Sequence, residues 1–297
     1  MYSQINANKR KTVFLMIGFF FLVGLIAFLV GLLFKDFFIT AFALVFAIGY
    51  AFWSYYGSAK AALSINGAKE IQKSDNPRLY RMVENLTITT GTPMPKVYIM
   101  PDQALNAFAT GRDPNHAAVA VTSGLLETLN DSELEGVLAH ELGHIQNYDI
   151  MVSMITFGLV AAVSLISDII LRWMFWGNMG DDDDGAKTSP VFIIIGIVAL
   201  ILAPIVASLI QLSISRKREY LADATGALTT RYPEGLASAL EKIRDASQGS
   251  VMKKQTPSTA HLFFANPLKN KSMMNLFSTH PPIEERIKVL REMGNKA

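Results

Sequence analysis

Four long apolar stretches constrain this chain more than any other feature of its sequence. They cover residues 13–34, 37–56, 151–176 and 191–214. A helix needs roughly 20 apolar residues to cross a hydrocarbon core of about 30 Å, so each stretch is long enough to be a membrane span. A signal peptide is the alternative for the first stretch, but its apolar region would be shorter, about 7–15 residues. The first two stretches therefore predict a helical hairpin in a membrane.

Basic residues predict the orientation of the spans. Residues 9–11 before the first span and 216–218 after the fourth are all basic, and basic residues gather on the cytoplasmic side. The acidic run 181–184 lies between the third and fourth spans, where the outer face is expected. Both termini and both large polar segments are therefore predicted to be cytoplasmic.

The chain divides into four parts on this basis. Residues 1–57 form the first transmembrane hairpin, and residues 151–214 form the second. Residues 58–150 form a cytoplasmic part that contains a histidine motif, and residues 215–297 form a cytoplasmic helical part. The predicted fold is a mainly helical integral membrane protein with four transmembrane helices and a cytoplasmic α+β domain.

The small sheet of that domain is predicted from three runs rich in residues that favour strands. They are residues 96–100, 106–111 and 117–122, with a turn at 112–115 that contains Pro114. The segment 248–278 reads as a loop within the otherwise helical C-terminal part.

Composition narrows the chemistry. The chain has no cysteine, which excludes disulfides, thiolate metal sites and cysteine nucleophiles. Any metal must be held by histidine or carboxylate side chains, and there are only five histidines. The net charge of +2 gives no basis for a nucleic-acid partner.

A histidine pair on a predicted helix is the strongest candidate for a metal site. Asn130 and Glu133 have the spacing of a capping box, so a helix is expected from residue 131. On it, His140 and His144 are one turn apart, about 6 Å along the axis, and share a face. Two such imidazoles can bind one zinc, and Glu141 can take a proton from a metal-bound water. Surface histidines without a metal are the alternative.

Catalytic zinc usually has three protein ligands and an open position for water. Glu219 is the best candidate for the third ligand, because the hairpin of the third and fourth spans would return it to His144. Asp223 lies one turn further and can support a ligand from behind. Alternatively, Glu219 only balances the basic residues 216–218.

With these motifs the chain resembles the M48 peptidases, a family of zinc metalloproteases. The resemblance covers essentially the whole chain and rests on residues 140–144, 219–223, 106–109 and 278–282. It implies a zincin-type metalloprotease domain with one Zn²⁺ per chain. It also implies that His140, His144 and Glu219 are the ligands and that Glu141 is the catalytic base.

The resemblance further implies a biological role and a location. The role is proteolytic quality control, with damaged or misfolded membrane proteins as polypeptide substrates. The location is a prokaryotic plasma membrane, with the active site on its cytoplasmic face. The oligomeric state stays open.

Weaker candidates complete the predicted site. His280, in the late His-Pro motif, is expected to stabilise the oxyanion, although it can also simply begin a helix. Arg286 is expected to pair with Asp223. An extended substrate is expected to add a strand to the edge offered by four residues, Asn106, Ala107, Phe108 and Ala109. Asn106 can alternatively be only a turn residue.

Two other functions are compatible with the motif. An intramembrane zinc protease would cut within the bilayer, but here the motif follows the polar segment 130–135, which favours cleavage at the membrane surface. A membrane scaffold with a structural zinc would normally fill all four positions with protein ligands, and only His280 is available as a fourth.

Overall fold

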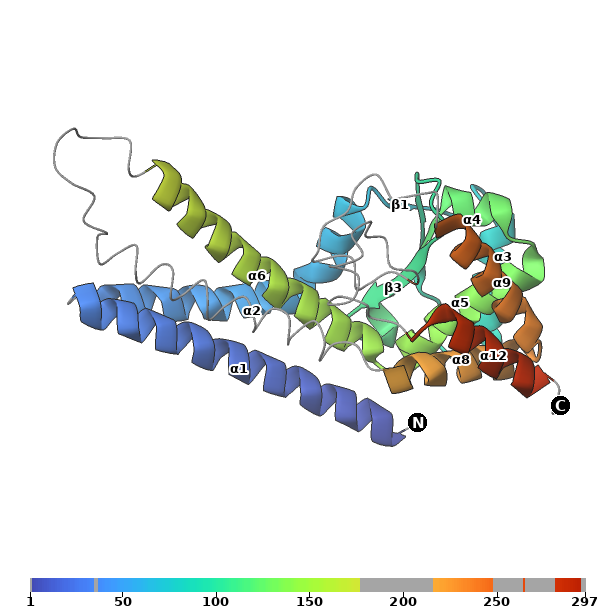
Figure 1. The fold of residues 1–297 in the computed structure, drawn as a ribbon, viewed down its shortest axis with the longest axis horizontal. Coiled ribbons are helices and arrows are strands. Elements are labelled where there is room, and N and C mark those ends of the chain that lie inside the picture. Colours follow the sequence, from blue (N-terminus) through green and yellow to red (C-terminus); the bar gives the residue numbers. More distant parts are fainter. Residues whose placement is uncertain (1, 35–36, 177–215, 248–263, 265–280, 295–297) are drawn as a thin grey trace.

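The computed structural model describes residues 2–34, 37–176, 216–247, 264 and 281–294. The predicted span 191–214 and His280 lie outside these residues, as do most of the loop 248–278 and the acidic run 181–184. Three long helices extend from a body built of shorter helices and one small sheet (Figure 1).

The long helices are α1 (Tyr2–Phe34), α2 (Phe37–Ile65) and α6 (Asp149–Trp176). They pack on one another along a shared apolar contact made by Leu15, Phe19, Ala47, Val152, Ile155, Leu159 and Ala162. Two of these helices exceed the predicted bounds. α1 starts well before residue 13, and α2 continues beyond residue 56 into the body.

Within the described ranges, no single helix is long and apolar enough to cross a membrane, but one pair bent by 79° meets the criteria when its helices are taken together (Asp131–Gln146 with Asp149–Ala162). The four predicted spans therefore stay a prediction.

The sheet has four strands in the order β1-β2-β4-β3, so β3 lies at an edge. The strands are β1 (Lys69–Glu70), β2 (Lys96–Met100), β3 (Ala107–Gly111) and β4 (Ala117–Thr122). β2 and β4 are parallel, and the other pairs are antiparallel. The three predicted strands are confirmed, with Asn106 just outside β3. The predicted turn holds the short 3-10 helix η1 (Pro114–His116), and β1 was not predicted.

Helix α5 (Asp131–Gln146) is the centre of the body. The predicted capping box is present, because the Asn130 side chain accepts from the Glu133 backbone and the Glu133 side chain accepts from that of Asn130. β3 and the helices α3 (Pro77–Thr90), α8 (Arg216–Thr230) and α9 (Pro233–Ser247) contact α5. α12 (Ile283–Gly294) packs on α8 and α9, and α4 (Ser123–Thr128) packs on β4.

Two glycines let neighbouring helices approach α5 closely. A Cβ at Gly136 would lie 2.7 Å from the backbone nitrogen of Leu236 on α9. A Cβ at Gly226 on α8 would lie 3.1 Å from the backbone nitrogen of His140. Since a side chain at Gly226 would press against that backbone, glycine allows α8 to lie directly beside the histidines of α5.

α5 and α6 are separate helices, because a sharp turn breaks the chain between them. α5 ends at Gln146, and Tyr148 adopts a positive φ of 59°. Asn147 closes the helix through its backbone N–H, which donates to the Gly143 carbonyl, and through its side chain, which donates to the same oxygen at 3.0 Å. The chain therefore turns sharply at residues 147–148 before α6 begins.

Candidate metal centre

Two histidine rings meet on one face of α5. The Nε2 atoms of His140 and His144 lie 3.1 Å apart, and the two ring planes are nearly perpendicular. Two nitrogen ligands on one tetrahedral zinc, each at about 2.0–2.1 Å, would be separated by about 3.3 Å. The spacing of these nitrogens therefore suits a shared metal ion.

Glu219 from α8 brings a carboxylate to the same point. Its Oε2 is 3.7 Å from Nε2 of His140, and its Oε1 is 3.6 Å from Nε2 of His144. The ligand atoms of the three residues all lie within 4.8 Å of one another. Two imidazole nitrogens and one carboxylate oxygen form a donor set that zinc accepts, and they leave a fourth position open.

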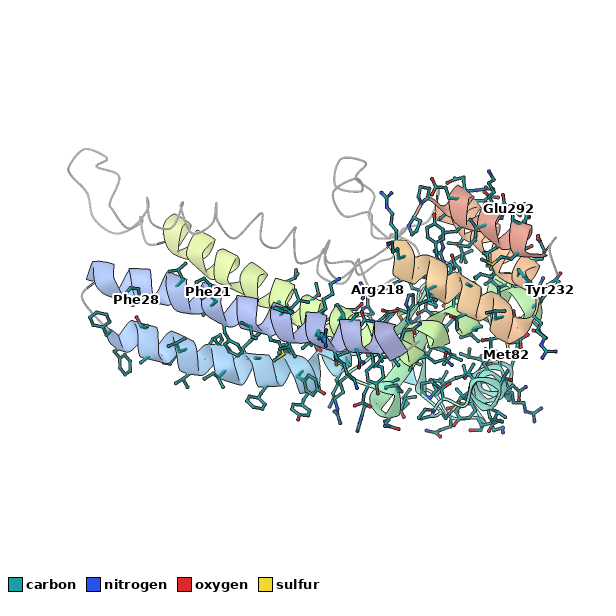
Figure 2. All side chains as sticks on the ribbon, turned by 90° about the horizontal axis from the view of Figure 1, so that it is seen from below. Phe21, Phe28, Met82, Arg218, Tyr232 and Glu292 are labelled. Carbon is teal, nitrogen blue, oxygen red and sulfur yellow. The ribbon has the colours of Figure 1, made fainter. Side chains whose placement is uncertain are left out.

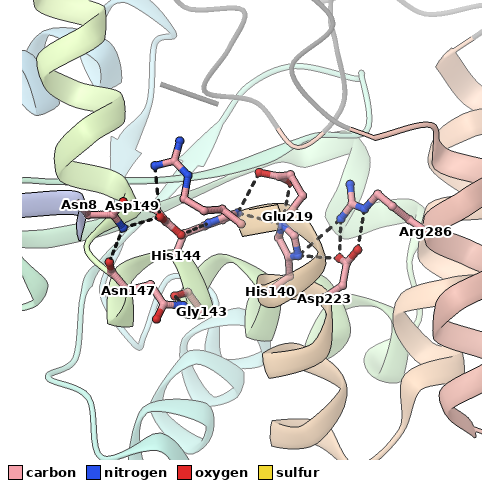
Figure 3. A network of polar contacts seen from close by, with 10 residues as sticks. Asn8, His140, Gly143, His144, Asn147, Asp149, Glu219, Asp223 and Arg286 are labelled. Atoms are coloured by element: carbon pink, nitrogen blue, oxygen red, sulfur yellow. Dashed lines mark hydrogen bonds and ion pairs between the residues drawn. The ribbon is translucent and has the colours of Figure 1, made fainter. Parts of the chain in front are cut away.

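Asp223, one turn after Glu219, fixes the orientation of His140 (Figure 3). Its Oδ1 lies 2.9 Å from Nδ1 of His140, and both side chains are fully buried. Burial lowers the pKa of His140 to about 4, even though Asp223 acts to raise it. The ring is therefore neutral at physiological pH. It donates its Nδ1 proton to Asp223 and directs the lone pair of Nε2 toward Glu219.

Arg286 from α12 forms the predicted ion pair with Asp223. Its Nε donates to Oδ2 at 2.8 Å, and its Nη2 donates to Oδ1 at 2.7 Å. Burial alone would raise the pKa of the Asp223 carboxyl, but the Arg286 guanidinium and His140 outweigh burial and hold that pKa well below its usual range. Asp223 is therefore ionised at physiological pH and can accept the hydrogen bond from Nδ1 of His140.

His144 has an equivalent partner, one that no motif in the sequence predicts. Its Nδ1 lies 3.0 Å from Oδ2 of Asp149, the first residue of α6. Burial acts to lower the pKa of His144, but the carboxylates of Glu219 and Asp149 outweigh it and raise that pKa to about 9. Without a metal, the His144 ring is therefore protonated on both nitrogens and positively charged at neutral pH, and a metal must displace the proton on one of them.

Asp149 is itself held by two other segments. Nδ2 of Asn8 on α1 donates to its Oδ1 at 2.8 Å, and Nη1 of Arg218 lies 3.4 Å from the same oxygen. The only sequence signal for Asp149 is a charge at the start of an apolar stretch, five residues after His144. Nothing in the sequence points to Asn8, because its contact depends on how α1 packs.

Glu141 is buried next to the metal ligands. Its side chain is only 4% exposed, and its charge contributes to the raised pKa of His144. This neighbourhood suits the predicted base, whose role stays a prediction. His280, the predicted oxyanion donor, lies outside the described residues.

The predicted substrate edge lies beside the metal centre and is occupied at one position. Asn106, Ala107, Phe108 and Ala109 are all buried. The backbone N–H of Phe264 donates to the Ala107 carbonyl at 3.0 Å. The Phe264 ring packs edge-on against His140 at 4.9 Å between centroids, and the guanidinium of Arg286 lies 4.8 Å from its centre. Phe264 therefore lies between β3 and the candidate ligands, which no sequence pattern indicated.

Comparison with known proteins identifies the family. The family model "Peptidase family M48" matches residues 73–294. The chain belongs to peptidase family M48. Among curated M48 relatives, the Protease HtpX homolog of Tropheryma whipplei (strain Twist) is 54% identical over 297 residues, covering 100% of this chain and 99% of that protein. The Protease HtpX homolog of Lactobacillus acidophilus is 46% identical and covers 99% of this chain and 100% of its own length.

A solved structure shares the fold. The crystal structure of S. mikatae Ste24p matches with a TM-score of 0.52 at 20% identity, covering 98% of this chain and 67% of the other. Membership of M48 makes this chain a metalloprotease, so its substrates are polypeptides. The cluster of His140, His144 and Glu219 can hold the metal that such an enzyme requires.

Proposed function

We propose that this chain is a membrane-bound zinc-dependent endopeptidase, with one zinc held by His140, His144 and Glu219. The observation that carries the proposal is the convergence of these three donors, from two helices far apart in the sequence, within 4.8 Å. Each histidine also has a carboxylate on its other nitrogen, Asp223 for His140 and Asp149 for His144. Such carboxylate–histidine pairs are typical of metal sites in proteins.

The chain's own residues supply proton transfer and orientation in the proposed mechanism. A bound zinc would supply Lewis acidity and a water of lowered pKa. Glu141 accepts a proton from the attacking water and delivers it to the leaving amine. Arg286 keeps Asp223 charged, so that His140 keeps its donor nitrogen toward the carboxylate. His280 donates to the oxyanion that develops on the scissile carbonyl.

An extended substrate segment is proposed to lie along β3. Ala107 and Val121 are paired, and the Thr122 N–H donates to the Asn106 carbonyl, so the main-chain groups of Ala107 and Ala109 face the free edge. The Ala107 carbonyl already accepts a hydrogen bond from the backbone N–H of Phe264. A substrate strand would therefore bond to Ala109 first, or displace Phe264. Main-chain bonding gives low sequence specificity, which suits varied clients.

The proposed membrane arrangement has four spans and a cytoplasmic active site, with transmembrane hairpins at residues 1–57 and 151–214 and cytoplasmic parts at 58–150 and 215–297. Large apolar side chains cover the outward faces of α1 and α2 (Figure 2), among them Phe14, Phe21, Phe28, Phe38, Phe42 and Val45. Such a patch marks contact with a lipid or protein partner. Quality control of misfolded membrane proteins at the cytoplasmic face of a prokaryotic membrane is the proposed role.

The absence of cysteine makes this topology directly testable. Single cysteines would replace Lys60 and Lys187 in an otherwise unchanged chain. A membrane-impermeant thiol reagent should label Lys187→Cys in intact cells and Lys60→Cys only after the membrane is broken. The reverse pattern would contradict the cytoplasmic site.

The catalytic proposal is tested with Glu141→Gln. The variant keeps the size of the side chain and removes the base, so stoichiometric zinc should remain while casein cleavage falls by about 10²-fold or more. Undiminished cleavage would show that Glu141 is not the base. A second measurement maps where the wild type cuts a model membrane protein. Cuts found only inside its membrane spans would favour an intramembrane protease instead.

A further inference from the structure

The N-terminal end of α1 reaches the metal centre from the far end of the sequence. The side chain of Asn8 is only 3% exposed. Its Nδ2 donates to the carbonyl of Asn147 at 2.8 Å and to Oδ1 of Asp149 at 2.8 Å. An amide NH₂ has two protons, so both are used. One side chain thus connects α1 to both sides of the turn between α5 and α6 (Figure 3).

From Asn8 a continuous path of hydrogen bonds leads to a candidate ligand. Oδ1 of Asp149 accepts from Asn8, and Oδ2 of the same carboxylate lies 3.0 Å from Nδ1 of His144. His144 in turn directs Nε2 toward His140 and Glu219. Asn8 on α1 therefore fixes one oxygen of the Asp149 carboxylate, and the other oxygen contacts the candidate metal ligand His144.

Asp149 needs the donor that Asn8 provides. The carboxylate is buried, and a buried charge is costly unless hydrogen bonds replace its water. Among described residues, the other side-chain donor at this oxygen is Arg218, whose Nη1 is 3.4 Å away, longer than a strong charge-assisted bond. The 2.8 Å bond from Asn8 to Oδ1 is shorter, and the second Asn8 bond, to the Asn147 carbonyl, fixes the amide that makes it, so Asn8 sets the rotation of Asp149 more firmly.

We propose that Asn8 is a positioning residue of the metal centre: through Asp149 it holds the His144 ring in the orientation that binds zinc. The first long helix is then part of the catalytic apparatus as well as an anchor. The inference rests on the proposed zinc site, and its test must separate the two.

Lys9 offers a matched control on the same end of α1. Its Nζ lies 4.7 Å from the ring centre of Tyr148, so it also docks α1 on the α5–α6 turn. No described contact links Lys9 to Asp149. Lys9→Met therefore weakens the docking of α1 and leaves the path to His144 unchanged.

The experiment uses the full chain in detergent, in the Glu141→Gln background, so that metal binding is measured without proteolysis. Zinc affinity is measured by chelator competition, and the visible spectrum of the Co²⁺-loaded protein reports ligand geometry. Removing a partner of a metal-bound histidine typically weakens affinity about 10–100-fold. Asn8 acts one bond further out, so Asn8→Ala should weaken zinc about threefold to tenfold and shift the Co²⁺ bands. Lys9→Met should do neither.

A double-mutant cycle shows whether the effect passes through Asp149. If it does, Asn8→Ala should cause no further loss of zinc affinity in an Asp149→Ala background. Asn8→Leu, which is similar in size and removes the polar amide, repeats the test should the alanine variant fold poorly. It should weaken zinc to the same extent.

Three results would overturn the inference. The first is that both Asn8 variants keep the zinc affinity and Co²⁺ spectrum of the Glu141→Gln parent. The second is that Lys9→Met loses as much zinc affinity as Asn8→Ala. The third is that adding Asn8→Ala to Asp149→Ala lowers zinc affinity by the full amount that Asn8→Ala causes alone. If the Glu141→Gln parent itself binds no zinc, the proposed metal centre fails, and with it the inference. Zinc binding by the parent with unchanged Asn8 variants rejects the inference alone.

Discussion

Replacing Asp223 with alanine should cost the protein both stability and metal affinity, by different routes. Arg286 would lose its two bonds of 2.7 and 2.8 Å while its side chain stays 0% exposed. Removing one partner of a buried ion pair costs about 3–5 kcal/mol, because the remaining charge is uncompensated. His140 would also lose the acceptor of its Nδ1 proton, which weakens metal binding about 10–100-fold.

A second substitution separates these two losses. In Asp223→Ala with Arg286→Met, neither partner of this pair leaves an uncompensated charge, and apolar replacement of a buried pair is often neutral for stability. Thermal unfolding of the metal-free protein in detergent should therefore show a large loss for the single variant and recovery for the double variant. Zinc affinity, measured by chelator competition, should stay low in both. A double variant no more stable than the single, or wild-type zinc affinity in either, would refute the reasoning.

Three further outcomes follow from individual contacts. Because the metal-free pKa of His144 is about 9 and that of His140 about 4, one proton leaves on binding, so apparent zinc affinity should rise about tenfold per unit between pH 5 and 8. A flat profile by chelator competition would contradict this. Gly136→Ala should destabilise the protein by about 1–3 kcal/mol in thermal unfolding, because its Cβ would meet the α9 backbone. Asn130→Ala should cost about 1 kcal/mol by the same assay, with zinc affinity unchanged, since the cap lies at the far end of α5.

Local patterns predicted the parts of the fold that short segments decide. The capping box at Asn130 and Glu133 marked the start of α5, because both of its bonds are made within one helical turn. The strands β2 and β4 were found at their observed bounds from composition. Helical spacing placed His140 and His144 on one face, and the search for a third ligand led to Glu219, which lies beside them.

Features that depend on packing between distant segments were not predictable in this way. β1 has only two residues and exists through its pairing with β2. The turn after α5 needs Tyr148 at positive φ, which tyrosine rarely adopts, so no residue preference announced it. Asn8 and Phe264 reach the metal centre across more than a hundred residues, and nothing near them in the sequence indicates their partners.

Metal content is the most direct test of the zinc centre. The Glu141→Gln parent and the Glu141→Gln protein that also carries Glu219→Ala would be analysed for bound zinc after dialysis against a weak chelator. The parent should hold one zinc per chain, and the Glu219→Ala variant should lose most of it, since two histidines alone bind far more weakly than three ligands. Stoichiometric zinc retained by Glu219→Ala would contradict the assignment of His140, His144 and Glu219 as the metal site.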